Sequence, residues 1–175
     1  MRLRLRLLLL VFLSFWKKRT GFLDESVITL TVLPNDIDIL KISDDRYFAL
    51  MDLGRMNIVF RTGLLKSMFK NKWGPVVSFN TVRFRYPLKV FQRYQLKTKI
   101  VWWDDNTFYW KQTFERKGRV VATGYVCGTA LGPNGPVPSN QILSELGQSV
   151  TKPNQPEIVA RLKELEDLVH GSQKE

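Results

Sequence analysis

The sequence predicts an α+β domain in which an antiparallel β-sheet wraps around one long central helix. Three observations support this fold class: a short β-branched segment, a long proline-free segment with helical spacing, and then four strand-like runs. A sheet with one apolar face has to bury that face, and the long helix is the large element available to cover it.

The first strand and the long helix are separated by a polar loop. Val27–Val32 is short and β-branched, and Pro34 ends it because proline cannot donate to a β-ladder. The spacing of apolar residues predicts the helix over Asp44–Lys70, with Ser43 as its N-cap and acidic residues in the first turn. Gly63 is expected to interrupt the C-terminal part of this helix.

Four strand-like runs follow the helix, and we expect them to form a four-stranded meander. Apolar and polar side chains alternate around Val82–Tyr86 and along Tyr94–Trp102, so each strand has one apolar face. Turn residues at Asp104–Asn106 and Lys117–Gly118 separate the later runs. The strands over 108–115 and 119–131 should therefore pair as antiparallel neighbours.

The predicted domain covers residues 21–135 and is followed by a helical tail over residues 136–175. A cluster of glycine and proline at 132–136 closes the domain. Within the tail, Glu157–Val169 has the spacing of a short amphipathic helix. Its apolar face is expected to comprise Ile158, Leu162, Leu165 and Leu168.

Residues 1–20 form a basic and apolar segment. They carry six of the 27 basic residues and no acidic residue, and they enclose a run of ten mostly apolar residues, Leu7–Trp16. A membrane-spanning helix needs about twenty such residues, and basic residues stand where a signal cleavage site would be. We expect an interfacial helix on an anionic membrane surface. Packing on the folded domain and a secretory signal remain as alternatives.

Composition narrows the classes of function. Beyond residue 20 the chain has 21 basic and 16 acidic residues, a modest excess that argues against nucleic acid as a partner. Cys127 is the only cysteine, which excludes an internal disulfide and a thiolate zinc cluster. We interpret it as core packing rather than as a nucleophile. We expect a cytoplasmic protein, peripherally associated with a membrane, with no metal site.

The loop before the long helix carries the most informative motif. Asp36-Ile37-Asp38 follows the first strand, and Arg46-Tyr47 stands at the start of the helix. This arrangement resembles the thioesterase-like hotdog proteins related to 4-hydroxybenzoyl-CoA thioesterase, in which D-x-D, H-x-N-N and R-Y occur in this order. The likeness extends from about Val27 to Leu131. It includes three further segments: Arg61–Leu64, Arg83–Leu88 and Trp103–Asp105.

The resemblance implies a hotdog fold and an acyl-CoA thioesterase that cleaves the thioester of a fatty or aromatic acyl-CoA. Asp38 matches the family's catalytic acid, and Ser43 and Asp44 stand at the helix start that polarises the thioester carbonyl. The resemblance also implies a homodimer and no cofactor other than the CoA of the substrate. The residues expected to contact the substrate are Asp36, Arg46, Tyr47, Phe48 and Met51.

The motif departs from the family pattern in ways that bear on catalysis. The histidine has no counterpart, the loop is one residue shorter, and the paired asparagines correspond to Ser43 and Asp44. An ionised Asp44 would oppose the negative charge that develops on the substrate oxygen. A non-catalytic acyl-binding or membrane-associated hotdog protein therefore remains an alternative. For Asp36 and Asp38, capping of the turn after Pro34 also remains open.

Overall fold

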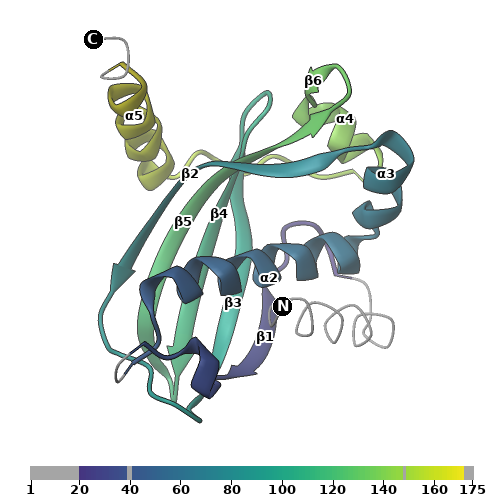
Figure 1. Ribbon diagram of the computed structural model, residues 1–175. Helices are drawn as coiled ribbons and strands as arrows, with labels where there is room; N and C mark the ends of the chain where they lie inside the picture. Colours follow the sequence, from purple (N-terminus) through teal and green to yellow (C-terminus); the bar gives the residue numbers. More distant parts are fainter. Residues whose placement is uncertain (1–19, 39–40, 148, 172–175) are drawn as a thin grey trace.

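A computed structural model describes residues 20–38, 41–147 and 149–171. Figure 1 shows a curled antiparallel sheet wrapped around the long helix α2 (Asp44–Thr62), which confirms the predicted fold class. The segment predicted to lie on a membrane surface falls outside the described residues except for its last residue, so its role stays a prediction.

The sheet has six antiparallel strands, and their order differs from the expected meander. The strands are β1 (Ser26–Thr31), β2 (Gly74–Phe84), β3 (Arg93–Trp103), β4 (Phe108–Arg116), β5 (Arg119–Gly132) and β6 (Gly135–Pro136). The order across the sheet is β1-β3-β4-β5-β2, with β6 paired to β5. The pairing of β4 with β5 is confirmed.

The prediction of a four-stranded meander is wrong for β2. Only β3, β4 and β5 follow one another, whereas β2 pairs with β5 at the far edge. The reason is that β1 already occupies the free side of β3, and α2 carries the chain across the sheet before β2 begins (Figure 1). The strand runs from Gly74 to Phe84, so it starts earlier in the chain than the predicted run Val82–Tyr86 and ends before Tyr86.

The core lies between α2 and the concave face of the sheet. Leu50, Met51 and Leu53 of α2 are buried against inward-facing side chains of β1, β3, β4 and β5, including Leu96 and Phe114. Alternate residues of β3 are buried from Tyr94 to Ile100, as the sequence pattern predicts. The apolar face of the sheet is thus covered by the long helix, as expected.

The predicted interruption of the long helix is confirmed at Gly63. Its φ of 85° lies in the left-handed region that glycine adopts at low cost, and it separates α2 from α3 (Leu64–Asn71). Because the chain turns here, α3 lies beyond the end of α2 and away from the sheet, and the chain rejoins the sheet at Gly74, the first residue of β2 (Figure 1).

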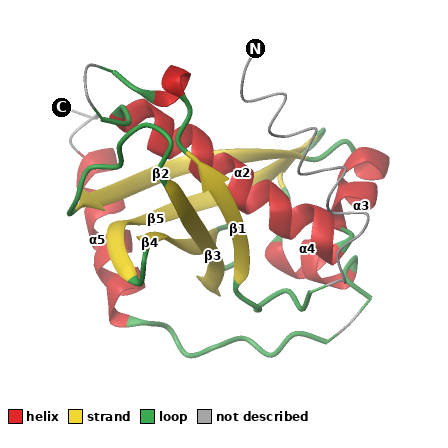
Figure 2. Ribbon diagram, turned by 90° about the horizontal axis from the view of Figure 1, so that it is seen from below, coloured by secondary structure: helices red, strands yellow, loops and turns green. Residues whose placement is uncertain are grey.

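The tail covers the outer face of the sheet with part of one helix. The tail contains α4 (Ser139–Ser144) and α5 (Glu157–Gly171), and Figure 2 shows α5 beside β4 and β5. Val159 and Leu162 are buried, with Val159 packed in a cluster with Trp102, Tyr109 and Cys127. Burial raises the pKa of Cys127 to about 12, which agrees with a packing role.

The predicted apolar face of α5 is only partly correct. Leu162 is buried, but Ile158, Leu165 and Leu168 remain 40%, 44% and 71% exposed. The first turns of α5 contact the sheet, and an ion pair between Lys163 Nζ and Asp104 Oδ2 at 3.2 Å holds them there. The later turns carry apolar residues that the sheet does not reach.

Gly54 permits the closest approach between α2 and the sheet. A Cβ atom at this position would lie 2.4 Å from Thr98 Oγ1 and 2.7 Å from Gln112 Nε2. Gly54→Ala should therefore destabilise the protein by about 1 to 3 kcal/mol, although alanine is the better helix former. Urea unfolding measures the change.

The matched control is Gly74→Ala, because no atom lies within 4 Å of the Cβ that it would add. This control should leave the free energy of unfolding nearly unchanged. A Gly54→Ala variant as stable as the wild type would mean that α2 does not pack this tightly on β3 and β4.

Candidate functional site

The two aspartates of the D-x-D motif lie in different environments. Asp36, at the end of the short 3₁₀-helix Pro34–Asp36, is 3% exposed, and its Oδ2 accepts a hydrogen bond from the Leu33 N–H at 2.9 Å. Its carbonyl oxygen accepts the Ser43 N–H at 3.0 Å. This geometry supports the turn-capping alternative for Asp36. Asp38 is exposed, and its backbone N–H donates to the Lys41 carbonyl at 3.1 Å.

The start of α2 places the other motif residues at the surface. Ser43 occupies the N-cap position, but its hydroxyl donates to the Asp45 carboxylate and accepts no hydrogen bond from a helix N–H group. Asp44 is exposed in the first turn. Arg46 Nε lies 3.7 Å from Asp45 Oδ2, a partly exposed ion pair of small energetic value.

Three of the residues expected to contact the substrate, Tyr47, Phe48 and Met51, do not face the same way. Tyr47 and Met51 are 3% and 1% exposed and belong to the core, whereas Phe48 is 37% exposed. Burial raises the pKa of Tyr47 to about 12, with Asp44 adding to the shift and a hydrogen bond with the backbone of Leu88 opposing it. Tyr47 is therefore a neutral core residue at physiological pH.

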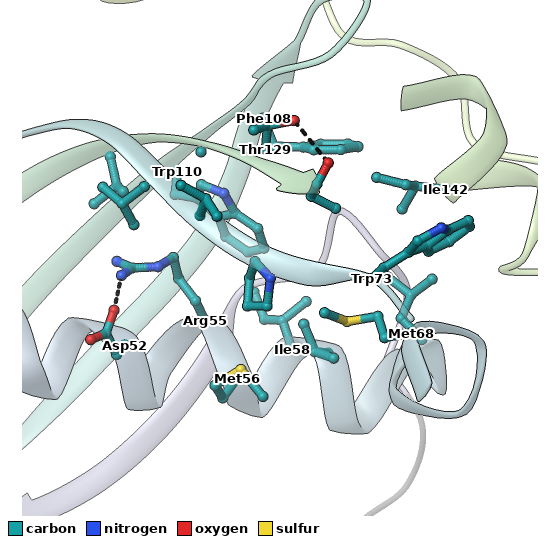
Figure 3. A pocket seen from close by; sticks show the side chains of 18 of the residues that line it. Asp52, Arg55, Met56, Ile58, Met68, Trp73, Phe108, Trp110, Thr129 and Ile142 are labelled. Carbon is teal, nitrogen blue, oxygen red and sulfur yellow. Dashed lines mark hydrogen bonds and ion pairs between the residues drawn. The ribbon is translucent and has the colours of Figure 1, made fainter. Parts of the chain in front are cut away.

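The structure contains an apolar pocket that the sequence did not predict. It has a volume of about 320 Å³ and lies between the second half of α2, α3, the start of β2, and strands β4 and β5 (Figure 3). Most of its lining is aromatic or aliphatic, and its polar side chains belong to Asp52, Arg55 and Thr129. Its apolar side chains include Val59, Met68, Trp73, Phe108, Trp110 and Ile142.

Asp52 and Arg55 form an ion pair at the edge of the apolar pocket. The pair joins adjacent turns of α2, with the Asp52 side chain 57% exposed and the Arg55 side chain 14% exposed. Arg55 Nη1 also donates to Gln112 Oε1 at 2.7 Å. Burial lowers the pKa of Arg55, and the Asp52 carboxylate opposes this shift. The guanidinium thus remains charged and orients the carboxylate beside the pocket.

Gln112 connects this ion pair to the sheet. Its side chain is fully buried, and Nε2 donates to the Met51 carbonyl at 2.9 Å and to Thr98 Oγ1 at 3.0 Å. Every polar atom of the side chain therefore has a partner, as a buried amide requires. A carboxylate held by this network next to an apolar cavity can act on a polar group at the end of an apolar ligand.

A second cavity, the basic cleft, lies at the other end of α2. It measures about 250 Å³ and is lined by residues from the loop before α2, from its first turns, and from the end of β2. Lys41 and Arg85 supply positive charge, and Asp44 supplies one negative charge. Among the predicted site residues, Asp44 and Tyr47 thus line the basic cleft, and Asp38 lines neither cavity.

The residues that sequence reasoning missed are Asp52, Arg55 and Gln112. The signal for Gln112 is its place on β4, two residues from both Trp110 and Phe114, so that all three share the apolar face of the strand. The signal for Asp52 and Arg55 is their spacing of three residues on a helix that carries an apolar face.

Comparison with known families identifies a family model that matches more than half of the chain. Residues 32–131 match the model of the thioesterase-like superfamily. The protein THEM6 of Drosophila melanogaster is 27% identical over 124 residues, which cover 70% of this chain and 62% of that protein. THEM6 of Xenopus laevis is 32% identical over 84 residues, which cover 47% of this chain and 41% of that protein. The chain thus matches less than two thirds of the length of these relatives.

Solved structures share the fold at low sequence identity. A gentisyl-coenzyme A thioesterase superposes with a TM-score of 0.60 at 22% identity, covering 68% of this chain and 98% of the other. A Staphylococcus aureus protein solved in complex with CoA gives a TM-score of 0.64 at 14% identity. The match covers 78% of this chain and 94% of that protein. At these identities the similarity demonstrates the hotdog-like fold alone.

Proposed function

Because the chain belongs to the thioesterase-like superfamily, we propose that it is an acyl-CoA thioesterase that hydrolyses the thioester of a fatty or aromatic acyl-CoA. The family includes acyl-CoA thioesterases among proteins of the same fold, such as the gentisyl-coenzyme A thioesterase. The substrate, the carboxylate that acts on it and the oligomeric state all form part of this proposal.

The observation that carries the proposal is the apolar pocket with a charged pair at its edge. A cavity of about 320 Å³ lies at the lower end of the size range of ligand sites, which are typically apolar with few polar groups. An acyl chain in this pocket is removed from water, and its thioester would lie near the polar edge. The basic cleft is smaller, at about 250 Å³, and three of its eight lining residues are charged.

Two carboxylates compete for the role of general base. Asp38 is proposed from the motif, and Asp52 from its place at the apolar pocket; we favour Asp52 because Arg55 holds it there. The base accepts a proton from water as the water oxygen bonds to the thioester carbonyl carbon. The C–S bond then breaks, and the CoA thiolate takes up a proton. Asp44 lies about 12 Å from Asp52 along the helix axis. Ser43 and Asp44 can therefore form the environment of the carbonyl oxygen only if Asp38 is the base.

Asp52→Asn should lower kcat for acyl-CoA hydrolysis by about 100-fold or more, because general-base catalysis contributes factors of this size. Release of free CoA thiol from medium- and long-chain acyl-CoA measures the rate. The matched control is Asp38→Asn, an equally conservative change at the other carboxylate, which should retain most of the activity.

The reverse result, with Asp38→Asn inactive and Asp52→Asn active, would assign the role of general base to Asp38. A wild-type protein that binds acyl-CoA without releasing thiol would favour the non-catalytic acyl-binding alternative. That outcome would agree with the loss of the family histidine and with the negative charge of Asp44.

A homodimer through β2 is also part of the proposal. β2 is an edge strand whose residues are all exposed or half-exposed, including Val76 and Val77 at 42% and 39%. An apolar edge strand of this kind offers unpaired backbone groups to another strand, and a second copy would present the same edge. Residues of β2 line both cavities, so the dimer boundary would lie beside the site.

Sedimentation equilibrium should therefore give twice the chain mass of 20.4 kDa. Val77→Lys places a charge on the exposed edge and should shift the protein towards the monomer, whereas Lys111→Gln, on the central strand β4, should not. A wild-type protein that stays monomeric at high micromolar concentration would contradict the dimer.

Residues 1–20 are proposed to hold the protein on an anionic membrane surface of the cytoplasm. The proposal depends on the sequence of this segment. Within the described ranges, no helix is long and apolar enough to cross a membrane. Phe22 belongs to the domain, because its ring packs 6.1 Å from Trp103 and 5.8 Å from Phe108 between centroids. The segment can therefore be removed up to residue 19 without loss of this contact.

Deletion of residues 1–19 should abolish co-sedimentation with vesicles that contain phosphatidylserine and leave the melting temperature nearly unchanged. Each basic residue near such a surface contributes about 1 kcal/mol, and the segment carries six. Neutral vesicles serve as the control. Equal binding of the truncated protein to these vesicles would exclude residues 1–19 as the membrane-binding segment. Unfolding on truncation would favour packing of the segment on the domain.

A further inference from the structure

The basic cleft has positive charge that the folded protein does not neutralise. Lys41 and Arg85 line it, and neither forms an ion pair among the residues that the structure describes. Asp44 is the one acidic side chain in the lining. The cleft therefore offers two cations to a ligand from outside the chain.

The end of β2 holds the cleft residues on fixed backbone. The N–H groups of Arg85 and Tyr86 donate to the Val121 carbonyl at 2.9 Å and 3.2 Å. The Tyr86 side chain is 51% exposed, next to the arginine and facing the same cleft. Arginine recognises phosphate through charge-assisted hydrogen bonds, and an exposed aromatic ring can stack on a nucleobase.

An exposed stripe of α2 connects the basic cleft to the apolar pocket. Asp44 lines the cleft, Asp52 lines the pocket, and Phe48 lies between them on the same side of the helix at intervals of four residues. At a rise of 1.5 Å per residue, Asp44 and Asp52 are about 12 Å apart along the helix axis. One ligand with an apolar tail and a long polar arm can reach both cavities.

We propose that the basic cleft binds the phosphate-bearing nucleotide end of CoA, with Arg85 and Lys41 on phosphate oxygens and Tyr86 stacked on the adenine. This inference rests on the proposed function, because it assigns the far end of the same substrate. Asp44 has the wrong sign for this ligand and weakens its binding. The phosphopantetheine arm of a carrier protein would present one phosphate and no adenine.

Isothermal titration of the full chain with CoA, 4′-phosphopantetheine and pantetheine tests the assignment without turnover. Arg85→Gln should weaken CoA binding about tenfold, the usual size of the loss of one charged hydrogen bond, and leave pantetheine binding unchanged. Asp44→Asn should strengthen CoA binding several-fold. The control is Arg83→Gln, which removes the same charge from an exposed β2 residue outside the cleft and should change the affinity less than twofold.

Equal CoA affinity in Arg85→Gln and the wild type, or equal losses in both arginine variants, would overturn the proposal. Inorganic phosphate that binds as tightly as CoA, with the same dependence on Arg85, would also overturn it, because the nucleotide would then add nothing. So would phosphatidylserine vesicles that bind the protein lacking residues 1–19 with the same dependence on Arg85 as CoA. CoA binding through Arg85 without thiol release from acyl-CoA would support the cleft and contradict the hydrolase. Hydrolysis that is independent of Arg85 and of the nucleotide would support the hydrolase and contradict the cleft.

Discussion

The close approach of α2 to the sheet at Gly54 is the constraint on which the candidate site depends. With no side chain at this position, the helix backbone lies against Thr98 and Gln112. Gln112 can therefore reach the Met51 carbonyl at 2.9 Å and accept a hydrogen bond from Arg55 at 2.7 Å. The same contact that fixes the helix on the sheet supports the guanidinium that orients Asp52.

The path of the chain after α2 shapes both cavities. The turn at Gly63 sends α3 away from the sheet, and β2 then returns along the far edge beside β5. The start of β2 lines the apolar pocket, and the residues that follow its end line the basic cleft. Substrate binding and dimer formation, as proposed, would depend on the same edge strand. A change on β2 would then affect both.

The sequence predicted those parts of the fold that depend on local patterns. Alternation along β3, the N-cap position of Ser43 and the interruption at Gly63 are properties of neighbouring residues, and the structure confirms all three. The place of β2 depends on pairing with residues that lie 38 to 57 positions later in the chain, from the pair Phe84–Ala122 to the pair Gly74–Leu131, and periodicity does not record such pairing. The apolar pocket was missed for the same reason, since it combines side chains from α2, α3, β2, β4 and β5. Asp38 was visible because it belongs to the contiguous D-x-D pattern. Asp52 lies within the segment that resembles the family, but the role proposed for it depends on a pocket formed by distant segments.

The central claim is that the acyl chain occupies the apolar pocket with its thioester next to Asp52. A crystal structure with a thioether analogue of decanoyl-CoA, which cannot be hydrolysed, tests this claim most directly. We expect electron density for the chain between Trp73 and Trp110, with the analogue's sulfur near the Asp52 carboxylate. An empty pocket, with the chain bound elsewhere and the sulfur beside Asp38, would contradict the account.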